Sequence, residues 1–420
     1  MTNWQYNDYQ QWIDDGCKIN NKVIRLDLYN CKLTKLSENI GNLINLQELN
    51  CTQNKLTELP KTLSDLVNLR IFSCHNNKII KVSETVCKLI NLQELYLFGC
   101  DSIKLSENIG NLINLQELDC SKNELTELPK TLSDLVNLRT FYCNYNKITK
   151  LSKTINNLIN LQKLYLGVNK LTKLPKTLGN LINLRILNCC DNKLTELPET
   201  LGNLINLQKL YLGVNKLTKL PETLGNLIKL QELYCNNNKL IKLPETLGNL
   251  IKLQELYCNN NKLIKLPETF GNLINLRMLS CYDNRLTKFP ETMSNLINLI
   301  LLWCENNKLT KLPTYIIKFK HLEKIHYDTN IRIPINLQRF IDRDNNDDNV
   351  HNISIHTSLL DSINNLLLDT IEIKYNIIDD NILDSKTKSI LYNFIEDKTI
   401  GELLINFEEL LVYILEKIDN

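Results

Sequence analysis

Apolar residues recur along most of the chain at a fixed spacing of 23 residues. The leucine that opens the segment "LQELN" at Leu46 has an equivalent in every following interval of 23 residues, as far as Leu322. One step back from Leu46 falls on Val23, which gives 14 copies, of which the first and the last are imperfect. Self-similarity at such a period is typical of solenoid proteins, in which each copy is one supersecondary unit. The pattern therefore predicts one repeat array over residues 23–334.

A short segment of each copy alternates apolar and polar residues, as in "LQELYC" at residues 230–235. This alternation predicts a β-strand in which Leu233 and Cys235 face the core and Tyr234 faces outward. One such strand per copy gives a parallel sheet. Neighbouring strands lie ~4.8 Å apart, and the returning segments, such as "LPETLGNLIK", are bulkier. We therefore expect the stack to curve, with its strands on the concave face.

The full frame of a copy is L-x-x-L-x-(L/C)-x-x-N-x-L-x-x-L-P, as between Leu46 and Pro60. With its "LPxxLGNLxxL" segment, this frame resembles the leucine-rich-repeat family, in particular the cytosolic 23-residue type, over about residues 23–334. The resemblance implies an α/β solenoid, which is a curved array with a parallel β-sheet on its concave face. The chain has no alanine and is rich in Asn, Ile and Lys, which suggests an AT-rich genome.

Asparagine and cysteine recur at two fixed slots of the frame, and we interpret both as structural. Asparagine fills the ninth slot in 12 of the 14 copies, where its amide can pair buried backbone groups of its own and the adjacent copy. Nine copies have cysteine in the sixth slot, as at Cys235 and Cys258, but others have leucine, so no thiol is required there. A disulfide needs Cβ atoms ~3.8 Å apart, and zinc needs four converging ligands rather than a row. Core packing is the favoured interpretation; a redox role and metal binding are the alternatives.

The outward positions of the strands are rich in aromatic residues and arginine. These residue types dominate interface hot spots, because each combines a large contact area with a polar group. The predicted partner-binding residues are Tyr96, Tyr142, Tyr165, Tyr211, Tyr234, Tyr257, Trp303, Arg139, Arg185, Arg277, Met278 and Leu301. An alternative is that stacked tyrosines only stabilise neighbouring strands. Met278, Ile300, Leu301 and Trp303 form an apolar cluster, expected to be exposed and to mark a contact surface, either for a partner or for the chain's own C-terminal region.

The two ends of the chain depart from the repeat. Residues 1–22 contain Trp4, Tyr9, Trp12 and Ile13 at roughly helical spacing, which predicts a helical cap on the N-terminal edge of the array. Residues 335–350 form a polar linker, and residues 351–420 predict a small α-helical C-terminal domain, whose last segment has one apolar face.

Charge and composition exclude several classes of function. With 49 basic and 47 acidic residues, the formal net charge is +2, which gives no general attraction to nucleic acid or to an anionic membrane. No signal peptide and no apolar run long enough to cross a membrane is visible, so a cytoplasmic location is expected.

Catalytic chemistry is not predicted for any part of the chain. The last cysteine is Cys304, inside the array, and His351 and His356 of the tail have no paired nucleophile or glycine-rich loop beside them. We expect no catalytic residue, cofactor, metal or small-molecule substrate. The favoured hypothesis is a non-catalytic scaffold or adaptor that binds an unidentified protein on the concave face. The alternative is a structural or self-associating protein whose C-terminal helical domain mediates oligomerisation.

Overall fold

The computed structural model describes residues 2–335 and 337, apart from residues 83 and 101–102. The chain divides into two compact units, Met1–Pro334 and Ile335–Asn420. Nearly all described residues belong to the first unit. The helical domain predicted for residues 351–420 lies outside the described residues, as does almost all of the predicted linker at 335–350.

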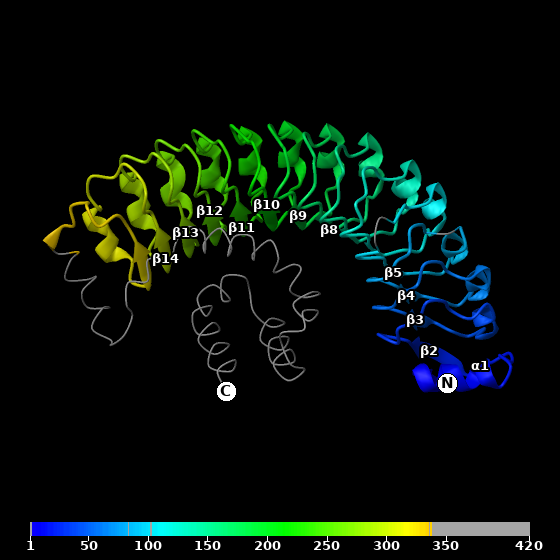
Figure 1. Ribbon diagram of the computed structural model, residues 1–420. Coiled ribbons are helices and arrows are strands. Elements are labelled where there is room, and N and C mark those ends of the chain that lie inside the picture. The colour runs from blue at the N-terminus through cyan, green and yellow to red at the C-terminus, as the bar shows by residue number, and fades with distance from the viewer. Residues whose placement is uncertain (1, 83, 101–102, 336, 338–420) are drawn as a thin grey trace, which may run out of the picture. The chain divides into compact units, whose positions relative to one another are not determined.

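One parallel sheet of 15 strands, hydrogen-bonded in sequence order, runs through the first unit. The strands are β1 (Thr2–Trp4), β2 (Val23–Asp27), β3 (Glu48–Asn50), β4 (Ile71–Ser73), β5 (Glu94–Tyr96), β6 (Glu117–Asp119), β7 (Thr140–Tyr142), β8 (Lys163–Tyr165), β9 (Ile186–Asn188), β10 (Lys209–Tyr211), β11 (Glu232–Tyr234), β12 (Glu255–Tyr257), β13 (Met278–Ser280), β14 (Leu301–Trp303) and β15 (Lys324–His326). Within this unit the strands lie on the inner, concave side of an arc (Figure 1).

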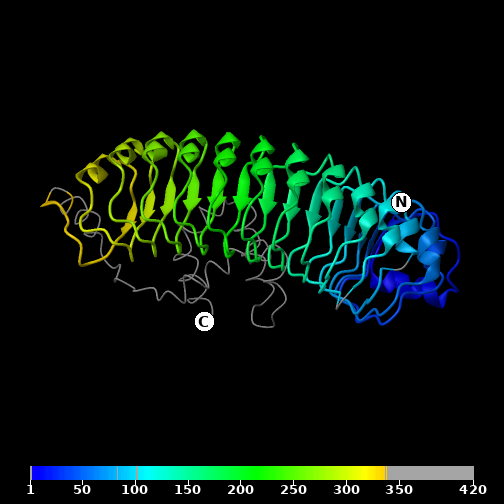
Figure 2. The same ribbon diagram turned by 90° about the horizontal axis from the view of Figure 1, so that it is seen from above.

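Short 3₁₀-helices form the return segments on the outer side of the arc, and in Figure 2 they stand in a row along one edge. They span Ile40–Asn42, Lys61–Asp65, Val86–Lys88, Glu107–Asn111, Lys130–Asp134, Lys153–Asn157, Lys176–Asn180, Glu199–Asn203, Glu222–Asn226, Glu245–Asn249, Glu268–Asn272, Glu291–Asn295 and Thr314–Lys318. In most copies a proline in extended conformation precedes the 3₁₀-helix, as Pro244 does with φ −66° and ψ 145°. Proline ends the extended segment there because it has no N–H to donate.

The register of the sheet follows the 23-residue period of the sequence. Leu233 pairs with Leu256 and Tyr234 with Tyr257, and the same pairing continues from copy to copy. The middle residue of the strand is buried in the core, as Leu233 and Leu256 are, each 0% exposed. The predicted curved solenoid with one parallel strand per copy is confirmed.

The N-terminal segment differs from the predicted helix at its beginning. Trp4 lies in β1, which pairs in parallel with β2, and the helix α1 (Tyr6–Asp14) follows. Tyr9 and Trp12 of α1 are buried, and the Tyr9 hydroxyl accepts a hydrogen bond from the Ser37 backbone N–H at 2.8 Å. The open edge of β2 offers unpaired backbone groups, which explains why the first residues form a strand there rather than a further helical turn.

Eleven of the twelve asparagines of the ninth slot pair the buried backbone of the turns, as predicted, whereas Asn330 of the last copy is exposed. The Asn238 Nδ2 donates to the Leu212 carbonyl of the preceding copy (2.9 Å) and to the Cys235 carbonyl of its own copy (3.2 Å). Its Oδ1 accepts from the Leu217 N–H at 2.9 Å. The residues that pair in this way, called the ladder asparagines below, are Asn54, Asn77, Asn123, Asn146, Asn169, Asn192, Asn215, Asn238, Asn261, Asn284 and Asn307.

The residue before a ladder asparagine adopts a left-handed backbone conformation. Its φ is 51° at Asn237, 50° at Val168 and 52° at Val214. Asparagine tolerates this region, but β-branched valine rarely adopts it. The two valines therefore show that the turn geometry is imposed by the surrounding hydrogen bonds and not by local preference.

The cysteines are free thiols, and those of the sixth slot are buried. Cys235 and Cys258 are each 0% exposed. Burial raises the pKa of the Cys235 thiol to about 12 and that of Cys258 well above its usual value. A neutral buried thiol packs as a small apolar group, which is the role predicted from the exchange of cysteine with leucine.

Replacement of a ladder asparagine tests the pairing of the turns. Asn238→Leu keeps the volume but leaves buried backbone groups of two copies unpaired, so we expect a loss of ~1–3 kcal/mol in the free energy of unfolding. Hydrogen exchange should accelerate around residues 212–240. The exposed Asn226 provides the control, because Asn226→Leu changes no buried pair. Unchanged exchange in Asn238→Leu would contradict the role of the ladder.

Thiol titration tests the packing role of the cysteines. In the native protein only the half-buried Cys31 should react quickly with a thiol reagent, because the other thiols are protected by burial. After denaturation without reductant all 14 thiols should react. Cys31→Ser should remove the fast phase alone. Recovery of about half of the thiols from freshly purified protein would indicate disulfides.

Candidate binding surface

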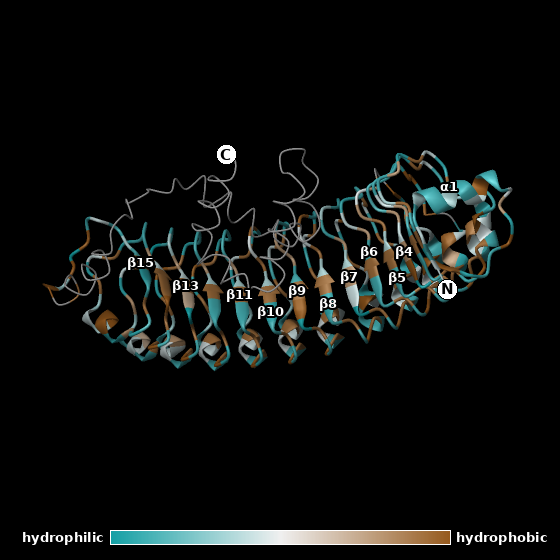
Figure 3. Ribbon diagram, turned by 90° about the horizontal axis from the view of Figure 1, so that it is seen from below, coloured by the Kyte–Doolittle hydropathy of each residue, from teal (hydrophilic) through white to brown (hydrophobic). Residues whose placement is uncertain are grey.

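In the three-residue strands β3–β15 the first and third residues project from the concave face of the sheet, on the side opposite the middle residue. Figure 3, which views the strands from this side, shows hydrophilic and hydrophobic strands interspersed along the array. The concave face is therefore a mixed surface whose chemistry changes from strand to strand.

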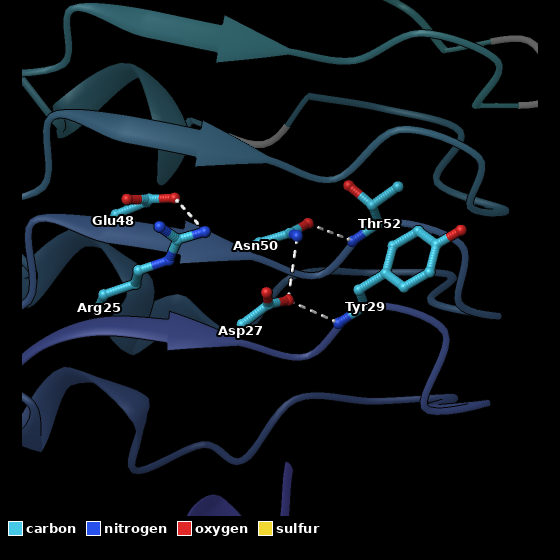
Figure 4. Close-up of polar contacts among 6 residues, drawn as sticks. All are labelled: Arg25, Asp27, Tyr29, Glu48, Asn50 and Thr52. Carbon is cyan, nitrogen blue, oxygen red and sulfur yellow. Dashed lines mark hydrogen bonds and ion pairs between the residues drawn. The ribbon is translucent and has the colours of Figure 1, made fainter. Parts of the chain in front are cut away.

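The N-terminal end of the concave face is a hydrogen-bonded polar network (Figure 4). Arg25 on β2 forms an ion pair with Glu48 on β3 at 3.3 Å. Asn50 donates from Nδ2 to Asp27 Oδ1 at 3.0 Å, and its own Oδ1 accepts from the Thr52 N–H at 3.1 Å. The ion pair and the Asn50–Asp27 bond join β2 to β3, and the Asn50–Thr52 bond lies within one copy.

Further along the sheet the predicted aromatic residues meet one another. Tyr142 and Tyr165 stack with their ring centroids 4.7 Å apart and an interplanar angle of 11°. Tyr211, Tyr234 and Tyr257 form a second run, with centroid distances of 4.8 and 4.5 Å.

The second run continues toward the C-terminal end of the array. Trp303 lies 6.1 Å from Tyr257 and 6.3 Å from His326, measured between ring centroids. Asn188 occupies the equivalent position between the two tyrosine runs, and Asp119 occupies it between Tyr96 and Tyr142. The predicted aromatic residues therefore form separate groups along the sheet and not one continuous row.

Glutamates that were not among the predicted site residues accept hydrogen bonds from the hydroxyl groups of three of the tyrosines, whereas the Tyr257 hydroxyl contacts Met278 Sδ at 3.5 Å. Tyr234 donates its hydroxyl hydrogen bond to Glu255 Oε2 on the next strand, and Tyr211 donates to Glu232 in the same way. Tyr96 donates to both Glu94 (2.9 Å) and Glu117 (3.1 Å). The recurring triplet "ELY" at residues 94–96, 232–234 and 255–257 was the available signal.

Burial shifts the acid–base properties of these groups. It raises the pKa of the Glu255 carboxyl to about 7, and the charge of Glu232 adds to the rise, while the Tyr234 hydrogen bond opposes it. Burial and the neighbouring carboxylates also raise the pKa of Tyr211 and Tyr234 well above the usual range. Lys209 forms an ion pair with Glu232 at 2.7 Å. The tyrosine hydroxyls are thus neutral hydrogen-bond donors and not nucleophiles.

The expected exposure of the predicted binding residues is wrong for several of them. Tyr165, Tyr211, Tyr234 and Tyr257 are 8%, 5%, 8% and 4% exposed. The apolar cluster expected to be exposed is also buried at three of its members, Met278, Ile300 and Leu301. Ring contacts between adjacent strands, together with the hydroxyl–carboxylate bonds of Tyr211 and Tyr234, cover part of the tyrosine surface. The residues that keep solvent exposure are the half-buried Tyr96, Tyr142 and Trp303 and the exposed Arg139, Arg185 and Arg277.

Other chemistries find no support among the described residues. No group of three or more His, Cys, Asp or Glu side chains in residues 2–335 is placed to hold a metal ion. None of the helices that the structure describes has the length and apolar character needed to span a membrane. The concave face offers aromatic rings, neutral hydroxyls, carboxylates and guanidinium groups, which suit non-covalent recognition.

A curved parallel solenoid with a leucine core, an asparagine ladder and a mixed concave face defines a class of repeat proteins. The sequence profile of the leucine-rich-repeat region matches residues 69–189 and 169–265. The chain belongs to the leucine-rich-repeat family. This fold is generally a protein-binding scaffold, and its members are typically non-catalytic.

Three solved structures illustrate the similarity. A leucine-rich-repeat protein of Leptospira interrogans is 30% identical, with 81% of this chain and 98% of that chain covered and a TM-score of 0.65. The functional domain of InlJ from Listeria monocytogenes, which includes a cysteine ladder, is 27% identical, with coverage of 72% and 68% and a TM-score of 0.55. The plant peptide hormone receptor RGFR1 in complex with RGF2 is 26% identical, with coverage of 74% and 55% and a TM-score of 0.59. A search of curated protein sequences finds no match.

The raised pKa of Glu255 makes stability depend on pH. In the unfolded chain this carboxyl releases its proton near its ordinary pKa of 4.5, but in the folded protein it keeps the proton up to about 7. Its contribution to stability is therefore full below the unfolded value and is lost as the pH rises through the folded value. Glu255→Gln removes the buried charge and keeps an acceptor for Tyr234. At about pH 8 the free energy of unfolding should rise by on the order of 1 kcal/mol.

Denaturant titrations at about pH 5 and about pH 8 check this expectation. The difference between the two conditions should be smaller in Glu255→Gln than in the wild type. Glu245 is exposed on a return segment, so Glu245→Gln should leave the pH dependence unchanged. Equal pH dependence in Glu255→Gln and the wild type would show that this carboxyl is not the group that titrates.

Proposed function

We propose that the protein is a non-catalytic scaffold that binds another protein along its concave face. The observation that carries the proposal is the row of exposed arginines Arg139, Arg185 and Arg277, which precede β7, β9 and β13 at equivalent slots of the frame. Arg139 precedes the strand that carries Tyr142. Strands β9 and β13, which Arg185 and Arg277 precede, carry no tyrosine but pair with strands that do, β8 and β10 in one case and β12 in the other. Guanidinium and aromatic groups in such proximity favour recognition of an extended segment that contains carboxylates and apolar side chains.

The proposed binding residues divide into two roles. Tyr96, Tyr142 and Trp303 have accessible ring surface and, with the three arginines, contact the partner directly. The other six proposed residues are buried and support the residues that make these contacts. They are Tyr165, Tyr211, Tyr234, Tyr257, Met278 and Leu301. Positioned aromatic groups lose little conformational entropy on binding, because stacking already fixes their rotamers.

The likeness to a receptor solved with RGF2 supports a peptide-like ligand for this face. A parallel sheet of many short strands presents equivalent side chains at regular intervals, which suits an extended chain lying across the strands. The free cysteines support a cytoplasmic location, because thiols stay reduced in that compartment.

Selection of peptides from a random library against the wild-type protein tests this proposal. The affinity of the selected peptides should fall about 10-fold or more in Tyr142→Ser and in Arg139→Glu. The matched control is Arg285→Glu, because Arg285 is exposed on the segment that leaves the sheet. It should bind like the wild type. Circular dichroism confirms that each variant is folded. Equal affinities for the wild type and both folded concave-face variants would place binding elsewhere.

A further inference from the structure

A continuous row of β-branched apolar residues is exposed along one edge of the array. It has one member in each of 12 consecutive copies, and every member is between 41% and 58% exposed. We call it the edge row; its members are Ile44, Val67, Ile90, Ile113, Val136, Ile159, Ile182, Ile205, Ile228, Ile251, Ile274 and Ile297. Single exposed isoleucines are common on protein surfaces, whereas a contiguous apolar surface usually marks a contact site.

The row lies in the turns that connect each 3₁₀-helix to the next strand. Ile205, for example, follows the 3₁₀-helix Glu199–Asn203 and precedes β10. This connection runs along the edge where the 3₁₀-helices stand in Figures 2 and 3. The equivalent positions in the first and last copies are Asn21 and Lys320. The apolar row therefore ends with polar residues at both ends of the array.

The polar neighbours of the edge row are mostly neutral and already hydrogen-bonded. Asn206 follows Ile205 and donates from Nδ2 to the carbonyl oxygen of Ile182, the edge-row residue of the preceding copy, at 2.9 Å. Asn68, Asn137 and Asn298 make the same bond at 2.9, 2.8 and 2.9 Å. Satisfied amides cost little to bury, and a scarcity of charge is characteristic of the central part of protein interfaces.

We infer that the edge row is a self-association surface on which a second copy of this chain binds. The apolar side chains repeat at the spacing of the solenoid itself, so a second solenoid matches all of them at once. A two-fold axis that crosses the row between Ile159 and Ile182 places each of these residues opposite the other in the second copy. Contacts of this kind are self-complementary, as in most homodimers.

The area of the row suffices for a stable dimer. Twelve β-branched side chains exposed by about half amount to on the order of 1,000 Å² per chain, compared with ~800 Å² per partner in a standard interface. The few charges beside the row include Lys229, whose ammonium group donates to Asn206 Oδ1 at 2.7 Å. Its charge lies away from the centre of the row, where like charges would oppose association most strongly.

Sedimentation equilibrium of the full chain tests the proposal. The wild type should form a dimer at micromolar concentration. Ile159→Lys combined with Ile182→Lys places lysines opposite lysines across the two-fold axis, so the dissociation constant should rise by about 100-fold or more. Ile159→Lys combined with Ile182→Asp introduces two charges of opposite sign and should retain more of the dimer than the double lysine variant.

The matched control is Ile241→Lys combined with Ile264→Lys. These residues are 55% and 56% exposed but lie outside the edge row, so the dimer should persist. A wild type that remains monomeric would overturn the proposal, as would a dimer that both double lysine variants retain equally. If the wild type is a monomer and the edge-row variant loses peptide or protein binding that the wild type has, the row binds a different partner. The peptide affinities of the concave-face variants are measured separately, so failure of one proposal does not affect the other.

Discussion

Each turn that leaves the sheet buries backbone carbonyl and N–H groups that no neighbouring strand can pair, and the amides of the ladder asparagines pair them. One Asn238 side chain serves its own copy and the preceding copy together. These hydrogen bonds of the asparagine amide hold the turn of one copy against the turn of the preceding copy. They therefore also fix the register between the strands of the two copies. Where Cys100 replaces asparagine, its thiol donates to the Cys74 carbonyl at 3.2 Å and takes over part of this role. The left-handed valine at Val214 shows that the ladder overrides the local preference of the backbone.

The register of the fold was predictable because core positions repeat without insertion. The alignment of Leu233 with Leu256 follows directly from the 23-residue period. The beginning of the chain was less predictable, since Trp4, Tyr9 and Trp12 fit a helical spacing in too short a segment to distinguish a helix from a strand followed by a helix. The free edge of β2 decides between them in the folded protein.

The positions of the aromatic residues on the concave face were predictable from the sequence, but their solvent exposure was not. Alternation shows on which side of the sheet Tyr234 lies, whereas its burial depends on the rings of adjacent copies and on the carboxylate of Glu255. The edge row illustrates the opposite case. Its isoleucines recur as regularly as the core leucines, and only the structure shows that Ile205 is half exposed while the adjacent Leu204 is fully buried.

The stacking of strands in strict sequence order has a consequence for how such a chain changes its length. Each strand bonds only to the strands before and after it, and the segments 230–246 and 253–269 are identical. Recombination between such segments removes or adds a whole copy and rejoins the chain in phase. The core, the ladder, the concave face and the edge row then all become shorter or longer by one unit together. Duplication of a copy therefore changes the length of both proposed surfaces while the interactions that stabilise the fold stay the same.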